Sequence, residues 1–157
     1  MRRALLVACL GLVTAVGCSE TTRPVASSPI VGRWVRQENL QSMGRMTRLL
    51  VFRNDGTFSL ATDMYGIYGG TGLAAYTHTS GTYEIDGDRV ICTATKEVTW
   101  DSFYGRTSPE TVRQINSVVF PEARFKVAAL TLTLDYLIYP ADAPEPTTLS
   151  FTLLGLD

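Results

Sequence analysis

Few side chains of this 157-residue chain could carry out acid–base, nucleophilic or metal chemistry, since it has one histidine and three cysteines. The histidine, His78, has no second histidine or cysteine close to it in the sequence, so it cannot form a zinc site. Serine and aspartate are plentiful, but no Gly-x-Ser-x-Gly or comparable setting for a nucleophile accompanies them. We therefore interpret His78 as a surface or mouth-lining residue, and we expect no catalytic residue, no metal and no cofactor.

The other polar candidates are better explained by structure than by chemistry. Asp86 and Asp88 flank a glycine, as turn residues do. The glycine-rich stretch 66–72 lacks the Gly-Lys-Ser/Thr ending of a phosphate loop, and no helical pattern follows it. Cys92 falls at an inward position of an alternating run, which predicts a small buried hydrophobe and not a redox thiol.

A different kind of chemistry is indicated at the N-terminus. Two arginines precede an apolar run, residues 4–16, which is too short to span a bilayer well. The run ends in Ala15-Val16-Gly17-Cys18, and small residues directly before a cysteine resemble the lipobox of bacterial lipoproteins. The resemblance implies that residues 1–17 are a lipoprotein signal peptide and that Cys18 becomes the lipid-modified N-terminus. An ordinary secretory signal cut near Gly17 is the alternative.

Acylation at Cys18 would decide where the protein resides. Two or more acyl chains, such as palmitate, anchor a protein stably in a membrane, whereas one chain does so only marginally. In this family an Asp after the cysteine retains the protein in the inner membrane, and here Ser19 takes that place. The resemblance thus implies the outer membrane of a double-membraned bacterium, facing the periplasm. Residues 18–29, rich in Ser, Thr and Pro, are the lipidated cysteine and a flexible tether.

Residues 30–157 form one domain that is long enough for a real core. Without the two signal arginines the chain has 12 basic and 15 acidic residues. It has no Lys/Arg run and no interleaving of aromatic with basic residues, so we expect no nucleic-acid partner. The sequence indicates one partner, the membrane, which the protein reaches through its N-terminal lipid. The sequence does not identify a protein partner.

The elements of this domain are expected to be strands. Leu50–Phe58 and Gly81–Cys92 each surround an Asp-Gly pair, the strongest short-range signal for a β-hairpin. In the second we expect Asp86-Gly87 to be a two-residue turn, which places Glu84 opposite Arg89. The inward side chains of this hairpin are then Tyr83, Ile85, Val90 and Cys92. Residues 129–139 also alternate, with Leu130, Leu132 and Leu134 on one face. Seven to nine such strands predict an antiparallel meander, and closure into a barrel would remove its edges.

Three motifs resemble those of a known family. Gly32-Arg33-Trp34 in the first strand resembles the Gly-x-Trp signature of lipocalins. Leu50-x-Phe52-x-x-Asp55-Gly56-Thr57-Phe58 and Gly81-Thr82-Tyr83 resemble the repeated hairpins of bacterial lipocalin-like lipoproteins. The resemblance covers roughly residues 30–154. It implies an all-β fold, an eight-stranded antiparallel up-and-down β-barrel, with Gly32 and Trp34 as the structural signature at its closed end.

The inward apolar residues leave two functions open. Five of them could contact a ligand, namely Phe52, Phe58, Tyr83, Leu132 and Phe151. If the barrel is not fully packed, they line an apolar cavity, and the protein is a membrane-anchored lipoprotein that binds a small hydrophobic ligand. If they pack solidly, they are the core, and the protein is an envelope lipoprotein that acts through protein–protein interaction.

Overall fold

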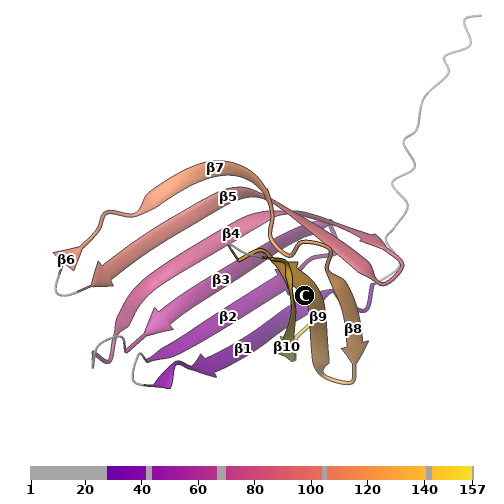
Figure 1. The fold of residues 1–157 in the computed structure, drawn as a ribbon, viewed down its shortest axis with the longest axis horizontal. Coiled ribbons are helices and arrows are strands. Elements are labelled where there is room, and N and C mark those ends of the chain that lie inside the picture. Colours follow the sequence, from indigo (N-terminus) through magenta and orange to yellow (C-terminus); the bar gives the residue numbers. More distant parts are fainter. Residues whose placement is uncertain (1–27, 42–43, 67–69, 104–105, 141–142, 157) are drawn as a thin grey trace, which may run out of the picture.

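The computed structural model describes residues 28–41, 44–66, 70–103, 106–140 and 143–156. The expected signal peptide, the lipidated cysteine and most of the tether lie outside these residues. Ten β-strands occur in the described residues (Figure 1). They are β1 (Gly32–Asn39), β2 (Arg45–Phe52), β3 (Thr57–Tyr65), β4 (Leu73–Asp86), β5 (Arg89–Phe103), β6 (Arg106–Thr107), β7 (Thr111–Val118), β8 (Arg124–Ala128), β9 (Thr131–Ile138) and β10 (Glu145–Gly155).

Eight of these strands form a closed antiparallel barrel. Around the barrel the order is β1, β2, β3, β4, β5, β8, β9 and β10, and β10 pairs back with β1. β6 and β7 pair with β5 outside this circuit. The predicted all-β, eight-stranded antiparallel barrel is therefore confirmed, and it is consistent with a lipocalin-like fold.

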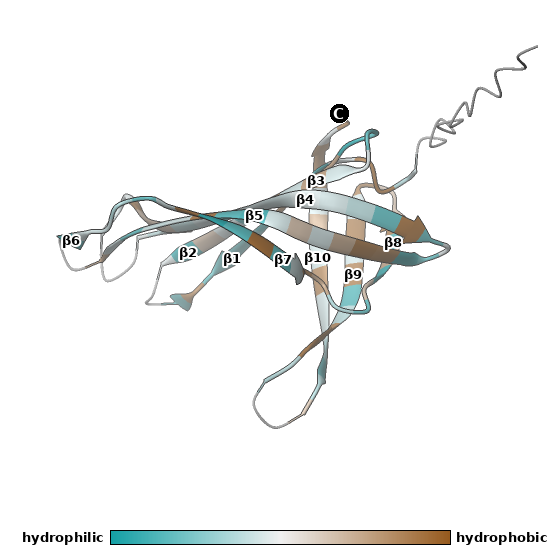
Figure 2. Cartoon of the chain, turned by 90° about the horizontal axis from the view of Figure 1, so that it is seen from above, coloured by the Kyte–Doolittle hydropathy of each residue, from teal (hydrophilic) through white to brown (hydrophobic). Residues whose placement is uncertain are grey.

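The barrel closes through two short seams. β1 meets β10 at Arg33, Trp34 and Val35, and β5 meets β8 at the single pair Arg89–Arg124. Beyond these seams the long strands β4 and β5 continue in one sheet with β2, β3 and β7, while the β9–β10 hairpin diverges from that sheet (Figure 2). The wall is thus continuous at one end and splayed at the other.

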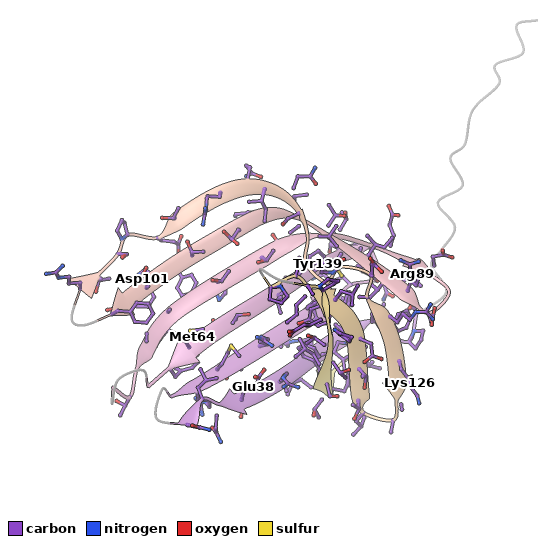
Figure 3. All side chains as sticks on the ribbon, in the orientation of Figure 1. Glu38, Met64, Arg89, Asp101, Lys126 and Tyr139 are labelled. Atoms are coloured by element: carbon purple, nitrogen blue, oxygen red, sulfur yellow. The ribbon has the colours of Figure 1, made fainter. Side chains whose placement is uncertain are left out.

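These seams define two ends, which we call the closed end and the open end. The closed end carries Gly32, Gly155 and the turn Ala129–Leu130. The open end carries Met64 on β3 and Asp101 on β5, and Figure 3 shows both far from Arg89 and Lys126.

The core fills the closed end. Its largest fully buried side chains are Trp34, Phe52, Phe58, Phe151, Ile30, Leu50, Leu132, Leu134, Val90 and Cys92. The indole N–H of Trp34 donates to the Ile30 carbonyl at 2.7 Å, so the segment that leads into β1 folds over the core. Gly32 has φ +147°, and a Cβ there would lie 3.1 Å from Leu153 Cδ1. Glycine at this position lets β10 cross β1 closely.

The Gly81–Cys92 hairpin differs from its prediction by one residue. Asp86 pairs with Arg89, so the two-residue turn is Gly87–Asp88 and the predicted Asp86–Gly87 turn is wrong. Gly87, with φ +62°, takes the first central position, where a type II′ turn places glycine. Glu84 consequently faces Ile91 and not Arg89. The predicted inward set is confirmed, since Tyr83, Ile85, Val90 and Cys92 all belong to the core or pack against it.

One leucine of the 129–139 run also differs from its prediction. Leu132 and Leu134 are fully buried, but Leu130 is exposed because it lies in the turn between β8 and β9. The alternating strand begins only at Thr131.

Candidate functional site

The five side chains expected to contact a ligand lie in the buried core. Phe52, Phe58, Leu132 and Phe151 are fully buried, and Tyr83 is nearly so. The rings of Phe52 and Tyr83 meet edge to face with a centroid distance of 4.9 Å, and those of Phe52 and Phe58 lie 6.4 Å apart. The grooves described below are lined by other residues. Whether these five side chains bind a ligand is not tested by this arrangement, so their role in binding stays a prediction.

Burial changes the acidity of two core groups. Burial raises the pKa of the Cys92 thiol to about 12. Burial also raises the pKa of Tyr83, with a smaller effect from Asp55. The Tyr83 hydroxyl donates to the Arg53 carbonyl at 2.8 Å, so this buried group is satisfied. A thiol that stays protonated at neutral pH is a poor nucleophile, as expected for a structural cysteine.

A charged network borders the core on its open side. Arg36 and Glu38 share the inward face of β1 with Trp34, and Arg48 lies opposite Arg36 on β2. Glu38 Oε1 accepts from Arg36 Nε at 2.6 Å and from Arg48 Nη1 at 3.2 Å. An apolar ligand that moves toward Trp34 from the open end must displace water from these charged groups. Because this desolvation costs free energy, the network disfavours such passage.

An apolar groove lies over the seam between β5 and β8. Residues 119–123 run beside β5 there: Val119 donates its N–H to β5 at 3.0 Å, and Ala123 accepts an N–H from β5 at 3.0 Å. Between these bonds Phe120 is buried, whereas Glu122 is exposed with φ +54°. The Phe120 ring meets the Tyr136 ring edge to face at 5.3 Å. This irregular segment closes the barrel and leaves a depression in its surface.

The groove has a volume of about 280 Å³. Its exposed apolar side chains are Ile91, Val118 and Tyr139, and exposed Arg89 and Glu122 add a charge of each sign. Figure 3 labels Arg89 and Tyr139. Typical pockets for drug-sized ligands are roughly 300–1,000 Å³, so this groove suits one aromatic ring or one branched aliphatic group.

His78 lies on the exposed face of β4. Its Nε2 lies 2.9 Å from Asp63 Oδ1, and its ring stacks on Tyr76 at 4.5 Å. Tyr76 in turn stacks on Trp100 at 5.6 Å. The Tyr76 hydroxyl donates to Glu110, and this hydrogen bond raises the pKa of Tyr76. The stack lies on the outer face of the sheet formed by β3, β4 and β5.

A groove of about 220 Å³ adjoins His78 and is also lined by the serines Ser59 and Ser80. In the part of the chain that the structure describes, no hydroxyl forms a hydrogen bond with His78. A nucleophile that a histidine activates normally lies within hydrogen-bond reach of it. The geometry therefore favours the interpretation of His78 as a surface residue held by Asp63.

The remaining predicted residues fall in separate places. Gly32 and Trp34 lie at the closed end, and Cys18 lies outside the described residues, so its acylation stays a prediction. Within the described ranges, no group of three or more His, Cys, Asp or Glu side chains could hold a metal ion. The same ranges contain no helix with the length and hydrophobicity needed to cross a bilayer.

Comparison with models of protein families, with curated proteins and with solved structures finds no match for this chain. The likeness to lipocalins therefore rests on the three sequence motifs and on the barrel.

Sequence reasoning missed both the charged network and the apolar groove. The network had a signal, since Arg36 and Glu38 follow Trp34 with period two and must share its inward face. The groove had none. It forms from residues 89–91, Val118, residues 120–123 and Tyr139, which only barrel closure brings together.

Proposed function

We propose that this protein is a lipid-anchored lipoprotein of the bacterial cell envelope, whose packed lipocalin-like barrel acts through protein–protein interaction. It binds a partner and does not catalyse a reaction. The observation that supports the proposal is the packing of the buried Phe58 and Tyr83 rings against Phe52, at the place where the alternative puts a ligand cavity.

The apolar groove over the β5–β8 seam is the proposed contact site. Protein interfaces draw most of their energy from a few aromatic or branched side chains seated in pockets. The groove accepts one such side chain between Ile91, Val118 and Tyr139. Arg89 and Glu122 beside it can pair with opposite charges on the partner and fix its orientation. The occupant is thus a protein segment with one large apolar side chain and neighbouring charges.

A small hydrophobic ligand is the second candidate, and the apolar lining of the same groove favours it. Its volume of about 280 Å³ suits a single ring or a short chain and not a whole lipid. Native mass spectrometry of protein extracted from its own membrane separates the two candidates. A stoichiometric small molecule on the protein would support the ligand and contradict the protein partner.

Acylation at Cys18 would hold the barrel at the membrane, in the outer membrane facing the periplasm. The test is a Cys18→Ser variant, which should leave the membrane fraction while the parent stays in it. A variant that fractionates with the membrane as the parent does would contradict the anchor.

Site-specific photo-crosslinking tests the contact site. Val118 and Val112 lie on the same strand and are 49% and 54% exposed, but only Val118 lines the groove. We expect a photoreactive residue at position 118 to give a protein adduct in the native envelope, and one at 112 to give none. Adding Ile91→Asp should abolish the adduct. Equal adducts at both positions, or an adduct that survives Ile91→Asp, would contradict the groove as the contact site.

A further inference from the structure

We infer that the closed end of the barrel rests on the lipid surface through Leu130, Leu154 and Leu156, so that the open end faces away from the membrane. This inference rests on the proposed lipid anchor. The three leucines are 61%, 60% and 79% exposed, the largest values among the exposed large apolar side chains that the structure describes. Apolar side chains gathered at one exposed place commonly mark a contact surface.

The segments that carry the leucines are neighbours, beside the point where the described chain begins. The Leu153 N–H donates to the Leu130 carbonyl at 2.8 Å, which places the β8–β9 turn next to the end of β10. Arg33 pairs with Gly155, so the end of β10 also lies beside the start of β1. Ser28 accepts the N–H of Val31 at 2.9 Å, just before that strand. The chain that leads to the anchor therefore leaves the barrel at the leucine side.

The tether is short. Ser28 follows Cys18 by ten residues, which span at most about 35 Å when fully extended. Ten residues reach this limit only when every one of them is fully extended. The closed end is therefore held at the lipid, and its apolar side chains are the first to reach it.

The turn that carries Leu130 has an unusual composition. Ala128 pairs with Thr131, so the central turn residues are Ala129 and Leu130. Ala129 has φ +50°, a conformation that favours glycine. The other two hairpin turns at this end do use glycine at positive φ, at Gly56 and Gly87. The exposed Leu130 side chain adds no internal packing, whereas contact with lipid gives it a role.

The charges around the leucines fit a membrane surface. Arg33 is exposed on β1, which adjoins β10, and Lys126 is exposed on β8, which adjoins the turn of Leu130. Figure 3 shows Lys126 on the β8–β9 side of the molecule. Basic residues beside an apolar contact are attracted to anionic lipid headgroups. The acidic turn residues of this end, Asp55, Asp86 and Asp88, belong to the other two hairpins. The leucines therefore adjoin basic side chains, while these acidic turn residues lie on the other two hairpins.

Labelled cysteines test the orientation in the full acylated chain, reconstituted in vesicles of phosphatidylethanolamine and phosphatidylglycerol. In the mature chain Cys18 carries the lipid and Cys92 is buried, so an introduced surface cysteine can be labelled selectively. We compare Leu154→Cys with the matched control Val112→Cys, both carrying an environment-sensitive fluorophore. Lipid-attached quenchers should quench position 154 at least two-fold more than position 112.

The outcomes separate this inference from the anchor. If the labelled chains sediment with the vesicles but both positions are quenched equally, the orientation is overturned and the anchor stands. If the parent chain does not sediment with vesicles at all, the anchor is overturned and the inference with it. If the difference appears only when envelope proteins are added, a protein covers this end and the lipid contact is overturned.

A second variant tests the leucines themselves. Leu130→Asn introduces a residue suited to turns, so the barrel should fold and melt as the parent does. Combined with Leu156→Asn, it should reduce the quenching of a label at position 154 at least two-fold. Unchanged quenching in this folded variant would overturn the role of the leucines.

Discussion

Replacing Phe52 by alanine tests whether the barrel interior is packed or hollow. Phe52 is fully buried and contacts the rings of Phe58 and Tyr83. Loss of its burial costs about 2–3 kcal/mol. A residual cavity on the order of 80 Å³ adds about 2 kcal/mol at roughly 24 cal/mol per Å³. We therefore expect Phe52→Ala to lower the free energy of unfolding by about 4 kcal/mol, within the range seen for buried Phe→Ala changes.

Urea denaturation followed by tryptophan fluorescence measures this loss, since Trp34 is buried in the same core. In a domain of this size the melting temperature should fall by about 12–16 °C. The control is Ile91→Ala, a partly exposed residue outside the core cluster, which should cost less than about 1 kcal/mol. If the alanine variant does not fold, Phe52→Leu should still cost about 1–2 kcal/mol.

A loss below about 1.5 kcal/mol for Phe52→Ala, close to that of the control, would refute the reasoning. Such a result means that the Phe52 side chain already borders an open space. The packed barrel would then be wrong, and the small hydrophobic ligand would become the better proposal.

Three further changes test other features of the fold. Gly81→Ala should cost more than about 2 kcal/mol in urea denaturation, because a Cβ there would lie 2.0 Å from the Thr93 carbonyl oxygen, and a near-neutral result would contradict this close approach of β4 and β5. Ala129→Gly should stabilise the barrel by about 1 kcal/mol, because glycine adopts the positive φ of position 129 without strain. A lower melting temperature for this variant would contradict the turn geometry. Because the folded state raises the pKa of Cys92 from 9.0 to about 12, the stabilisation from its protonated thiol is complete below pH 9 and is lost as the pH rises toward 12. Urea denaturation at pH 8 and at pH 10 should show a loss of roughly 1 kcal/mol in the free energy of unfolding that Cys92→Ala lacks, and equal losses in both proteins would contradict the burial of this thiol.

The barrel could be predicted because its signals are local. Gly56 and Gly87 mark two turns, and alternation places Phe52, Tyr83 and Cys92 on the inward face. The one-residue error at the second turn arose because turns at Asp86–Gly87 and at Gly87–Asp88 both give glycine its positive φ. Local chemistry therefore does not distinguish the two turn positions. The strand register, which sets Tyr83 opposite Cys92, does distinguish them.

The candidate sites were less predictable because they depend on contacts between distant segments. Residues 124–128 carry two basic side chains in a run of five, so no clear pattern identified them as a strand. Without that strand, the groove between Ile91 and Tyr139 could not be foreseen. Leu130 follows the same alternation as Leu132, and only the turn position separates the exposed leucine from the buried one.

The pairing of β1 with β10 has a consequence for the order of folding. Trp34 lies opposite Leu153, so β1 finds its second neighbour only through a pairing between residues far apart in the sequence. Contacts between residues so far apart in sequence form slowly, since a long loop must close first. Until β10 arrives, that edge of β1 is unpaired and the core beside Trp34 is incomplete. The core beside Trp34 is thus completed only by this long-range pairing, in which β10 closes the barrel against β1.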